Sequence, residues 1–133
     1  KLMTKSVSTF LMFTGRCEEA LTFYTSLISN SKIEGITRWG AGGPGKEGTV
    51  MRAAFTLNGV EYLATDSPAV HAFDFTPSMS LFVECDSEAE LDRVFAELSE
   101  GGKVLMPLGN YGFSKKFGWC DDRFGVSWQL NIT

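Results

Sequence analysis

The side chains best suited to nucleophilic or acid-base chemistry are few in this sequence and lie far apart. It contains one histidine, His71, and three cysteines, Cys17, Cys85 and Cys120. A cysteine nucleophile needs a base or a cation beside it to lower the pKa of its thiol, and Cys120 has only Lys115, Lys116 and Arg123 nearby in the sequence. We expect Cys120 and Cys85 to be structural. We expect Cys17, in the first turn of a helix that could mildly acidify its thiol, to be exposed and without a chemical role.

Histidine and carboxylates do not combine into a catalytic group either. His71 lies in a linker with two prolines, and we interpret it as a surface or partly packed residue; the alternative is a substrate contact made from a mobile linker. Asp121 and Asp122 could suggest an acid-base pair, but their position between two strand-like segments predicts an Asx turn with solvated charges. Without a second histidine or clustered carboxylates, no Ser-His-Asp arrangement can be built.

A glycine-rich segment, residues 40–47, almost matches a phosphate-binding P-loop. Gly40, Gly45 and Lys46 have the required spacing. Glu47, however, stands where the motif needs a serine or threonine to bind magnesium, and the following segment has the pattern of a strand instead of a helix. We predict a flexible loop at residues 40–48, which could close over a pocket as a lid.

The elements that position these residues are repeated. Residues 115–132 have the pattern of two strands joined by a turn, because large apolar side chains alternate with small or polar ones on both sides of the turn. About 66 positions earlier the same pattern occurs. Tyr62 aligns with Trp128 and Leu63 with Gln129, so the chain is predicted to contain two copies of one unit.

The first copy is predicted to be a strand, a helix and three strands. Thr14 is the expected helix cap, and Asn58-Gly59 is the expected hairpin turn. The predicted elements are a strand at 7–13, a helix at 16–28 and strands at 31–39, 49–57 and 60–66.

The second copy repeats this order. Ser80 and Phe82 align with Ser8 and Phe10, and Ser87 with Glu90 forms a capping box. The predicted elements are a strand at 80–85, a helix that ends at Gly101-Gly102, and strands at 103–108, 115–121 and 126–132. We therefore predict a single α+β domain, residues 1–133, with module one at 6–66, a linker at 67–78 and module two at 79–133.

Composition limits the possible partners and the compartment. A net charge of −4 and a pI near 5.0 argue against a nucleic-acid or anionic-membrane partner, since no basic stripe is present. No apolar run approaches the roughly 20 residues that span a bilayer, and the first residues lack the pattern of a signal peptide. The expected location is the cytoplasm.

The paired units, the FLMFTGRCEEALTFY opening and the WCDDRFGVSWQL ending resemble the vicinal oxygen chelate superfamily. Within it they are similar to the PhnB-like branch, also labelled 3-demethylubiquinone-9 3-methyltransferase-like. The superfamily includes glyoxalase I, fosfomycin-resistance enzymes, extradiol dioxygenases and bleomycin-binding proteins. The resemblance implies two βαβββ modules that form a curved, cup-like mixed sheet, usually in a homodimer. Fold alone does not choose among these functions.

Enzymes of the superfamily hold one divalent metal at four positions, one on the first and one on the last strand of each module. Carried over by the internal alignment, these positions fall on Ser8, Leu63, Ser80 and Gln129. None is a good metal ligand, because Leu63 cannot coordinate and the other three offer neutral oxygens. We therefore expect no cofactor; a shifted alignment of the fourth strand would reach a single carboxylate, Glu61.

The same face offers a pocket for a small molecule. Strand alternation predicts apolar walls with a few neutral hydrogen-bonding groups, which is typical of ligand sites. Aromatic residues of the second module could form a rim for the ligand or could instead bury a dimer interface. The predicted ligand-binding residues are Ser8, Phe10, Met12, Leu63, Ser80, Phe82, Tyr111, Trp119 and Gln129.

Three functions follow. The first, which we favour, is a metal-free, homodimeric protein that binds a small apolar or aromatic molecule; this interpretation leans against an enzyme and leaves the question open. The alternative is a metal-dependent lyase, transferase or dioxygenase of the vicinal oxygen chelate type. A methyltransferase is disfavoured, because no glycine-rich strand-to-helix turn is available for S-adenosylmethionine.

Overall fold

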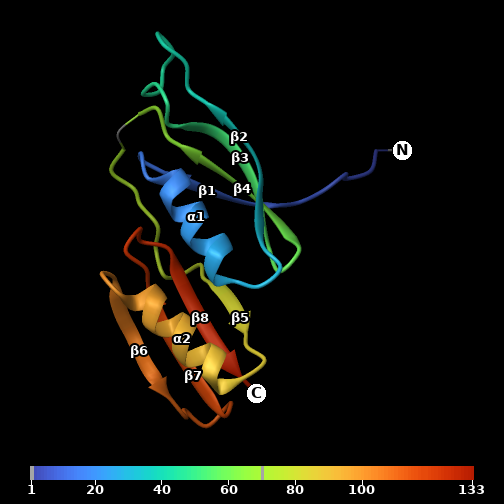
Figure 1. Ribbon diagram of the computed structural model, residues 1–133, viewed down its shortest axis with the longest axis vertical. Coiled ribbons are helices and arrows are strands. Elements are labelled where there is room, and N and C mark those ends of the chain that lie inside the picture. The colour runs from blue at the N-terminus through green and yellow to red at the C-terminus, as the bar shows by residue number, and fades with distance from the viewer. Residues whose placement is uncertain (1, 70) are drawn as a thin grey trace. The chain divides into compact units, whose positions relative to one another are not determined.

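Each half of the chain folds around its own sheet. The computed structural model describes residues 2–69 and 71–133. They form two units, Lys1–His71 and Ala72–Thr133, and each contains one helix and one four-stranded mixed sheet (Figure 1). The predicted α+β class with two βαβββ modules is confirmed.

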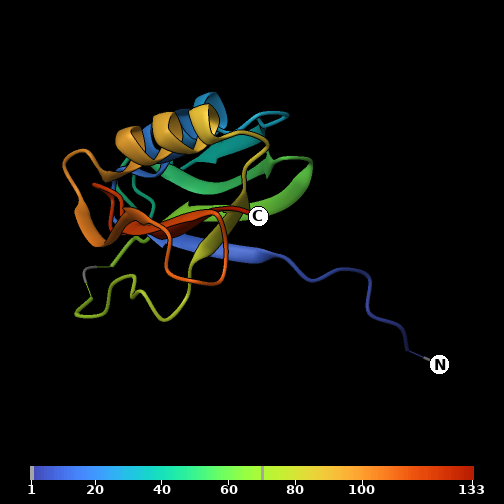
Figure 2. The same ribbon diagram turned by 90° about the horizontal axis from the view of Figure 1, so that it is seen from below.

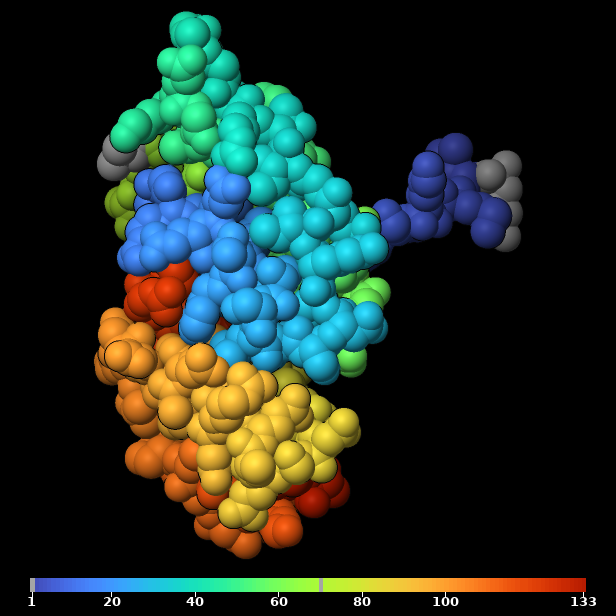
Figure 3. All heavy atoms as spheres, viewed as in Figure 1, coloured from blue at the N-terminus to red at the C-terminus, as the bar shows by residue number. Residues whose placement is uncertain are grey.

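The first sheet has the strand order β1-β4-β3-β2, with β1 parallel to β4 and the other pairs antiparallel. Residues 2–8 precede it as an exposed irregular segment (Figure 3). The elements are β1 (Thr9–Phe13), α1 (Cys17–Leu27), β2 (Lys32–Arg38), β3 (Val50–Leu57) and β4 (Val60–Asp66).

The second sheet repeats this topology as β5-β8-β7-β6, again with one parallel pair, β5 with β8. Ser87 caps α2 as predicted, since its Oγ accepts from the Glu90 amide at 3.1 Å. The elements are β5 (Leu81–Glu84), α2 (Glu88–Ser99), β6 (Lys103–Gly109), β7 (Lys116–Asp121) and β8 (Ser127–Ile132).

The registers of the two sheets confirm the internal alignment. Phe10 pairs with Leu63 across β1 and β4, and Phe82 pairs with Gln129 across β5 and β8. Residues that align in the sequence therefore occupy equivalent places in the two sheets. Asn58 and Gly59 form the predicted hairpin turn, with positive φ angles of 50° and 79°.

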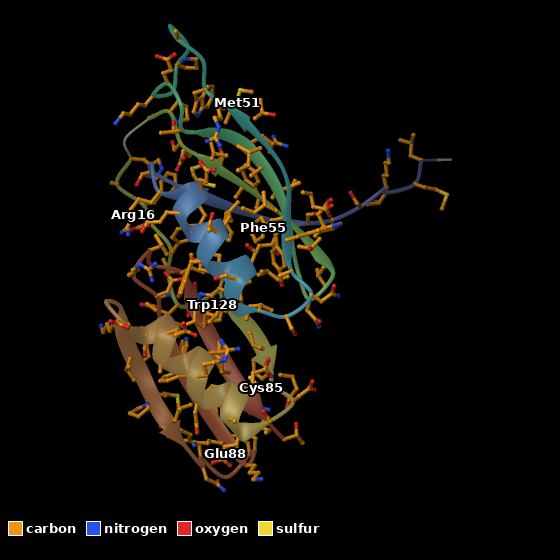
Figure 4. All side chains as sticks on the ribbon, in the orientation of Figure 1. Arg16, Met51, Phe55, Cys85, Glu88 and Trp128 are labelled. Carbon is orange, nitrogen blue, oxygen red and sulfur yellow. The ribbon has the colours of Figure 1, made fainter. Side chains whose placement is uncertain are left out.

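In each unit the helix covers one face of its own sheet (Figure 2). Phe55 on β3 and Trp128 on β8 are fully buried, each in the core of its own unit (Figure 4). Gly118 allows α2 to lie close to β7, because a Cβ there would stand 2.6 Å from a ring carbon of Phe95. Apolar residues alternate onto this covered face, as the strand pattern predicts.

The predicted cap of α1 is wrong. Thr14 does not cap the helix; Arg16 is the N-cap residue and makes no capping bond through its side chain. The buried carboxylate of Asp66, at the end of β4, accepts instead from the amides of Gly15 at 2.7 Å and Cys17 at 3.0 Å. Its other oxygen accepts from the Val50 amide at 2.9 Å. A charged acceptor from a distant strand thus supplies the cap.

Asp122 also differs from the prediction. It forms the expected Asx-type turn, since its Oδ1 accepts from the amides of Phe124 and Val126. Its charge is not solvated, however: Asp122 is only 3% exposed, and its Oδ2 accepts from the indole Nε1 of Trp128 at 2.8 Å. The turn is anchored to the core, because the buried carboxylate needs these donors.

All three cysteines are buried, so the expected exposure of Cys17 is wrong. Burial, followed by the charge of Asp66, raises the pKa of Cys17 to about 12. Burial likewise raises the pKa of Cys120 to about 12 and that of Cys85 to about 11. A low-pKa thiolate is therefore absent from these three positions.

Residues 40–48 form a loop between β2 and β3, as predicted, and not the strand-to-helix turn of a P-loop. The loop folds onto Trp39, because a Cβ at Gly45 would stand 2.4 Å from the indole ring. The indole Nε1 of Trp39 donates to the carbonyl oxygen of Asp66 at 3.1 Å. Among the described residues, no helix has the length and apolar character needed to cross a membrane.

Candidate functional site

Apart from Tyr111, which lies between β6 and β7, the predicted ligand residues lie on or directly before strands, at the sheet faces that no helix of their own unit covers. We call these the first open face and the second open face. Phe10, Met12 and Leu63 share the first open face, with Ser8 directly before β1. Ser80, Phe82, Trp119 and Gln129 belong to the second open face, with Ser80 directly before β5.

A chain of neutral hydrogen bonds crosses the second open face. The indole Nε1 of Trp119 donates to Ser127 Oγ at 2.8 Å, and Ser127 Oγ lies 2.8 Å from Ser80 Oγ. Gln129 Nε2 donates to the same Ser80 oxygen at 3.3 Å. Ser127 alternates with Gln129 along β8 and therefore shares this face, but its role as the centre of the network could not be predicted from the sequence. We call these four residues the neutral network.

Phe82 stands beside the neutral network. The residue is 59% exposed, although its backbone pairs with Gln129 on the neighbouring strand. In the parallel pair β5-β8 the two side chains project from the same face. An exposed aromatic ring next to ordered polar groups is the usual composition of a small-molecule site.

A second group of hydrogen bonds orients Glu84, two residues after Phe82. Its Oε1 accepts from Asn131 Nδ2 at 2.8 Å, and its Oε2 accepts from the amide and the Oγ1 of Thr133 at 3.0 and 2.9 Å. Ser114 Oγ donates to Asn131 Oδ1 at 2.5 Å. The bonds from Asn131 and Thr133 lower the pKa of Glu84. The carboxylate is therefore held ionised in one orientation.

Aromatic rings lie at one end of the second open face. The Phe113 ring meets the Phe117 ring edge-on at 5.1 Å, and Tyr111 stacks on Phe113 at 6.2 Å. The Tyr111 hydroxyl donates to the carbonyl oxygen of Pro107 at 2.6 Å. Tyr111 can therefore contribute a ring face to a ligand, while its hydroxyl is already engaged.

The first open face is simpler. Phe10 is 45% exposed, and the guanidinium carbon of Arg52 lies 5.2 Å from its ring centroid, a cation-π distance. Leu63 and Met12, the neighbours of Phe10 on this face, are partly exposed, and their side chains carry no hydrogen-bond donor and no strong acceptor. This face offers apolar contact and one cation.

The four positions carried over for a metal do not fit one. Leu63 has no donor atom, and Ser80 Oγ is already bound within the neutral network. Residues 2–69 and 71–133 contain no group of three His, Cys, Asp or Glu side chains placed for a metal ion. Neutral oxygens alone do not bind the usual catalytic metals well.

The sequence missed part of this site. Ser114 and Thr133 lie outside the strands. Ser114 reaches the face through one bond across 17 residues of chain, and Thr133 through two bonds to Glu84 across 49 residues. Strand alternation puts Glu84 on the same face as Phe82 and Asn131 on the same face as Gln129, and this was the only feature of the sequence that pointed to these two residues. Their bond to each other was not predictable, because it depends on the pairing of β5 with β8.

This architecture defines a class of protein. The chain has the fold of the glyoxalase/bleomycin resistance/dioxygenase superfamily. A domain of that superfamily from Frankia sp. EAN1pec superposes with a TM-score of 0.65 at 13% identity, over 98% of this chain and 93% of that one. FosX, a fosfomycin resistance protein from Listeria monocytogenes, superposes with a TM-score of 0.60 at 10% identity, over 99% and 95%. At these identities the likeness concerns the fold alone.

The chain belongs to the family described as 3-demethylubiquinone-9 3-methyltransferase, whose model matches residues 5–131. It is 56% identical to a PhnB protein from Bacillus cereus, with a TM-score of 0.94 over 97% of this chain and 100% of that one. It is 30% identical to PA1353 from Pseudomonas aeruginosa, with a TM-score of 0.82 over 97% and 98%. No curated protein matches the chain.

Proposed function

We propose that this chain is a metal-free protein that binds a small aromatic or apolar molecule on its second open face. The observation that carries the proposal is the exposed Phe82 ring beside the neutral network. Covering a phenyl ring removes apolar surface from water, at roughly 25 cal/mol per Å². The ring therefore supplies affinity, and the network beside it supplies orientation.

The neutral network also leaves a free acceptor. Gln129 donates through Nε2 to Ser80, and no described residue donates to its side-chain oxygen. That oxygen can accept from a hydroxyl or amide of the ligand. Trp119 and Ser127 hold their side chains fixed through their own bond, which lowers the entropy cost of binding.

Two other activities receive no support from the residues present. Metal-dependent chemistry of the superfamily would require ligands at positions now held by Leu63 and Gln129. The methyltransferase of the family description would require a nucleotide-binding crossover. The glycine-rich segment of this chain, residues 40–48, joins two antiparallel strands instead.

A homodimer is part of the proposal. Phe113 is 64% exposed and adjoins Tyr111, and such a cluster covers a ligand or a second copy of the chain. Light scattering of the purified protein and of a Phe113→Ser variant separates these two roles. A dimer that dissociates in the variant assigns the cluster to the interface, and an unchanged oligomeric state assigns it to the ligand.

The test of the proposed function combines metals and a neutral aromatic probe. After dialysis we expect no stoichiometric metal and no thermal shift with nickel, zinc, manganese or iron, since a folded-state ligand at 100 times its Kd would add about 2.7 kcal/mol. In NMR titrations, 2-phenylethanol should shift the indole signal of Trp119. A Phe82→Ser variant should lose this binding. A Val60→Ser variant, whose residue is equally exposed at 59%, should retain it.

Three results would contradict the proposal. One equivalent of bound metal would contradict the metal-free site. An absence of probe binding, or equal loss in the two variants, would show that Phe82 does not form a ligand site.

A further inference from the structure

Glu84 is a charged group that the neutral network does not explain. Its three hydrogen bonds come from Asn131 and Thr133, which are uncharged donors. These bonds fix the carboxylate without neutralising it. A negative charge thus stands on the second open face, held in place by neighbours that contribute no positive charge.

No cation of the described residues pairs with Glu84. Lys116, on the neighbouring part of the sheet, turns to α2 and lies 2.7 Å from Asp92 and 3.2 Å from Glu88. Arg93 pairs with Glu97 at 3.1 Å. The unit Ala72–Thr133 contains ten acidic and five basic residues, a formal charge of −5. Its electrostatic field favours cations over anions.

Aromatic residues share the sheet face of this carboxylate, along β5 and across β8. Phe82 precedes Glu84 by two residues, so the two side chains share the face of β5. Across the sheet, Asn131 on β8 pairs with Glu84 on β5 and with Phe117 on β7. The exposed Phe113 directly precedes Ser114, which donates to Asn131. The ordered charge therefore stands two residues from Phe82 along β5 and is separated from Phe117 by Asn131 on β8.

We infer that this part of the second open face binds the cationic nitrogen of the ligand, so that the ligand is an aromatic or apolar ammonium compound. The inference rests on the proposed function and names its ligand class. A carboxylate attracts an ammonium group directly, and the faces of nearby rings attract it through their quadrupoles when it lies within about 6 Å. A neutral ligand uses only the rings and the neutral network, and an anion is repelled by Glu84.

The test uses three probes of similar shape: 2-phenylethylammonium, 2-phenylethanol and phenylacetate. Titrations of the full chain, followed by NMR of the Trp119 indole, give the three Kd values. We expect the cation to bind about three- to tenfold more tightly than the alcohol, and phenylacetate more weakly than both. High salt should reduce the difference. A Glu84→Gln variant keeps an oxygen for the Asn131 bond, and it should bind the cation no better than the alcohol.

A Glu100→Gln variant removes the same charge from an exposed position at the end of α2 and should keep the preference. Equal binding of all three probes, with Phe82 still required, would overturn the inference and leave the proposed function standing. Loss of the preference in both variants would assign it to net charge and overturn the role of Glu84. Failure of every probe to bind would overturn both the inference and the proposed function.

Discussion

Replacement of Asp66 by asparagine should destabilise the first unit far more than its single-atom change suggests. The Asp66 carboxylate is 2% exposed and accepts three backbone amides, from Gly15, Cys17 and Val50. An asparagine can keep its oxygen on the first two amides. Its Nδ2 group then faces the Val50 amide, so two donors meet where a donor and an acceptor met before.

The expected cost follows from those bonds. Hydrogen bonds to charged groups contribute roughly 1.5–3 kcal/mol, and a buried donor without a partner costs roughly 1–3 kcal/mol. We therefore expect Asp66→Asn to lower the free energy of unfolding by about 2–4 kcal/mol. Urea denaturation followed by circular dichroism measures this change. The matched control is Glu61→Gln, an exposed carboxylate on the same strand.

Hydrogen exchange locates the effect. Exchange at the Val50 amide should accelerate more than exchange at Gly15 and Cys17, because the asparagine oxygen still serves those two. A change in unfolding free energy within about 0.5 kcal/mol, the range of ordinary surface substitutions, would refute the role assigned to Asp66. Equal acceleration at all three amides would refute the proposed orientation of the asparagine.

Two further predictions concern the core. Burial raises the pKa of Cys17 and Cys120 to about 12 and that of Cys85 to about 11, so the thiols stay protonated at pH 8. Iodoacetamide should leave the native protein unmodified and label all three cysteines in urea, as mass spectrometry would show; labelling of the native protein would contradict the burial. Gly118→Ala should cost about 1–3 kcal/mol, because the added Cβ overpacks the contact of β7 with α2. Gly35→Ala, whose Cβ meets open space, should not reproduce the loss measured in urea.

Much of the fold was predictable, because it rests on local patterns that occur twice. The alternation of apolar residues predicted seven of the eight strands to within one residue at each end and began the strand β1 two residues early; Ser87 correctly indicated the start of α2. The repeat added the pairing that local patterns cannot supply. Once Phe10 aligned with Phe82 and Leu63 with Gln129, the same register followed for both sheets.

The errors share one cause. Thr14 stands shortly before α1, and local sequence predicts it as the helix cap. The helix is capped instead by the carboxylate of Asp66, which is 49 residues from Cys17 in the chain. The sequence around Asp122 is typical of a solvent-exposed turn, yet the Asp122 carboxylate is buried and accepts a hydrogen bond from the Trp128 indole. Cys17 was expected to be exposed for the same reason. Each outcome depends on a contact that exists only after the sheet has formed.

Comparison of the two repeated modules shows where ligand-selecting groups lie. Equivalent positions of the two open faces carry Met12 and Glu84, Leu63 and Gln129. The first face is apolar where the second holds a charge and an amide, although the backbones repeat. A metal shared by the two modules would need ligands at equivalent positions in both, and the first module supplies none at Leu63. The polar groups that can select a ligand therefore belong to the second module. Substitutions at Gln129 and Glu84 should accordingly change which ligand binds, whereas substitutions at Leu63, on the first open face, should leave the choice of ligand unchanged.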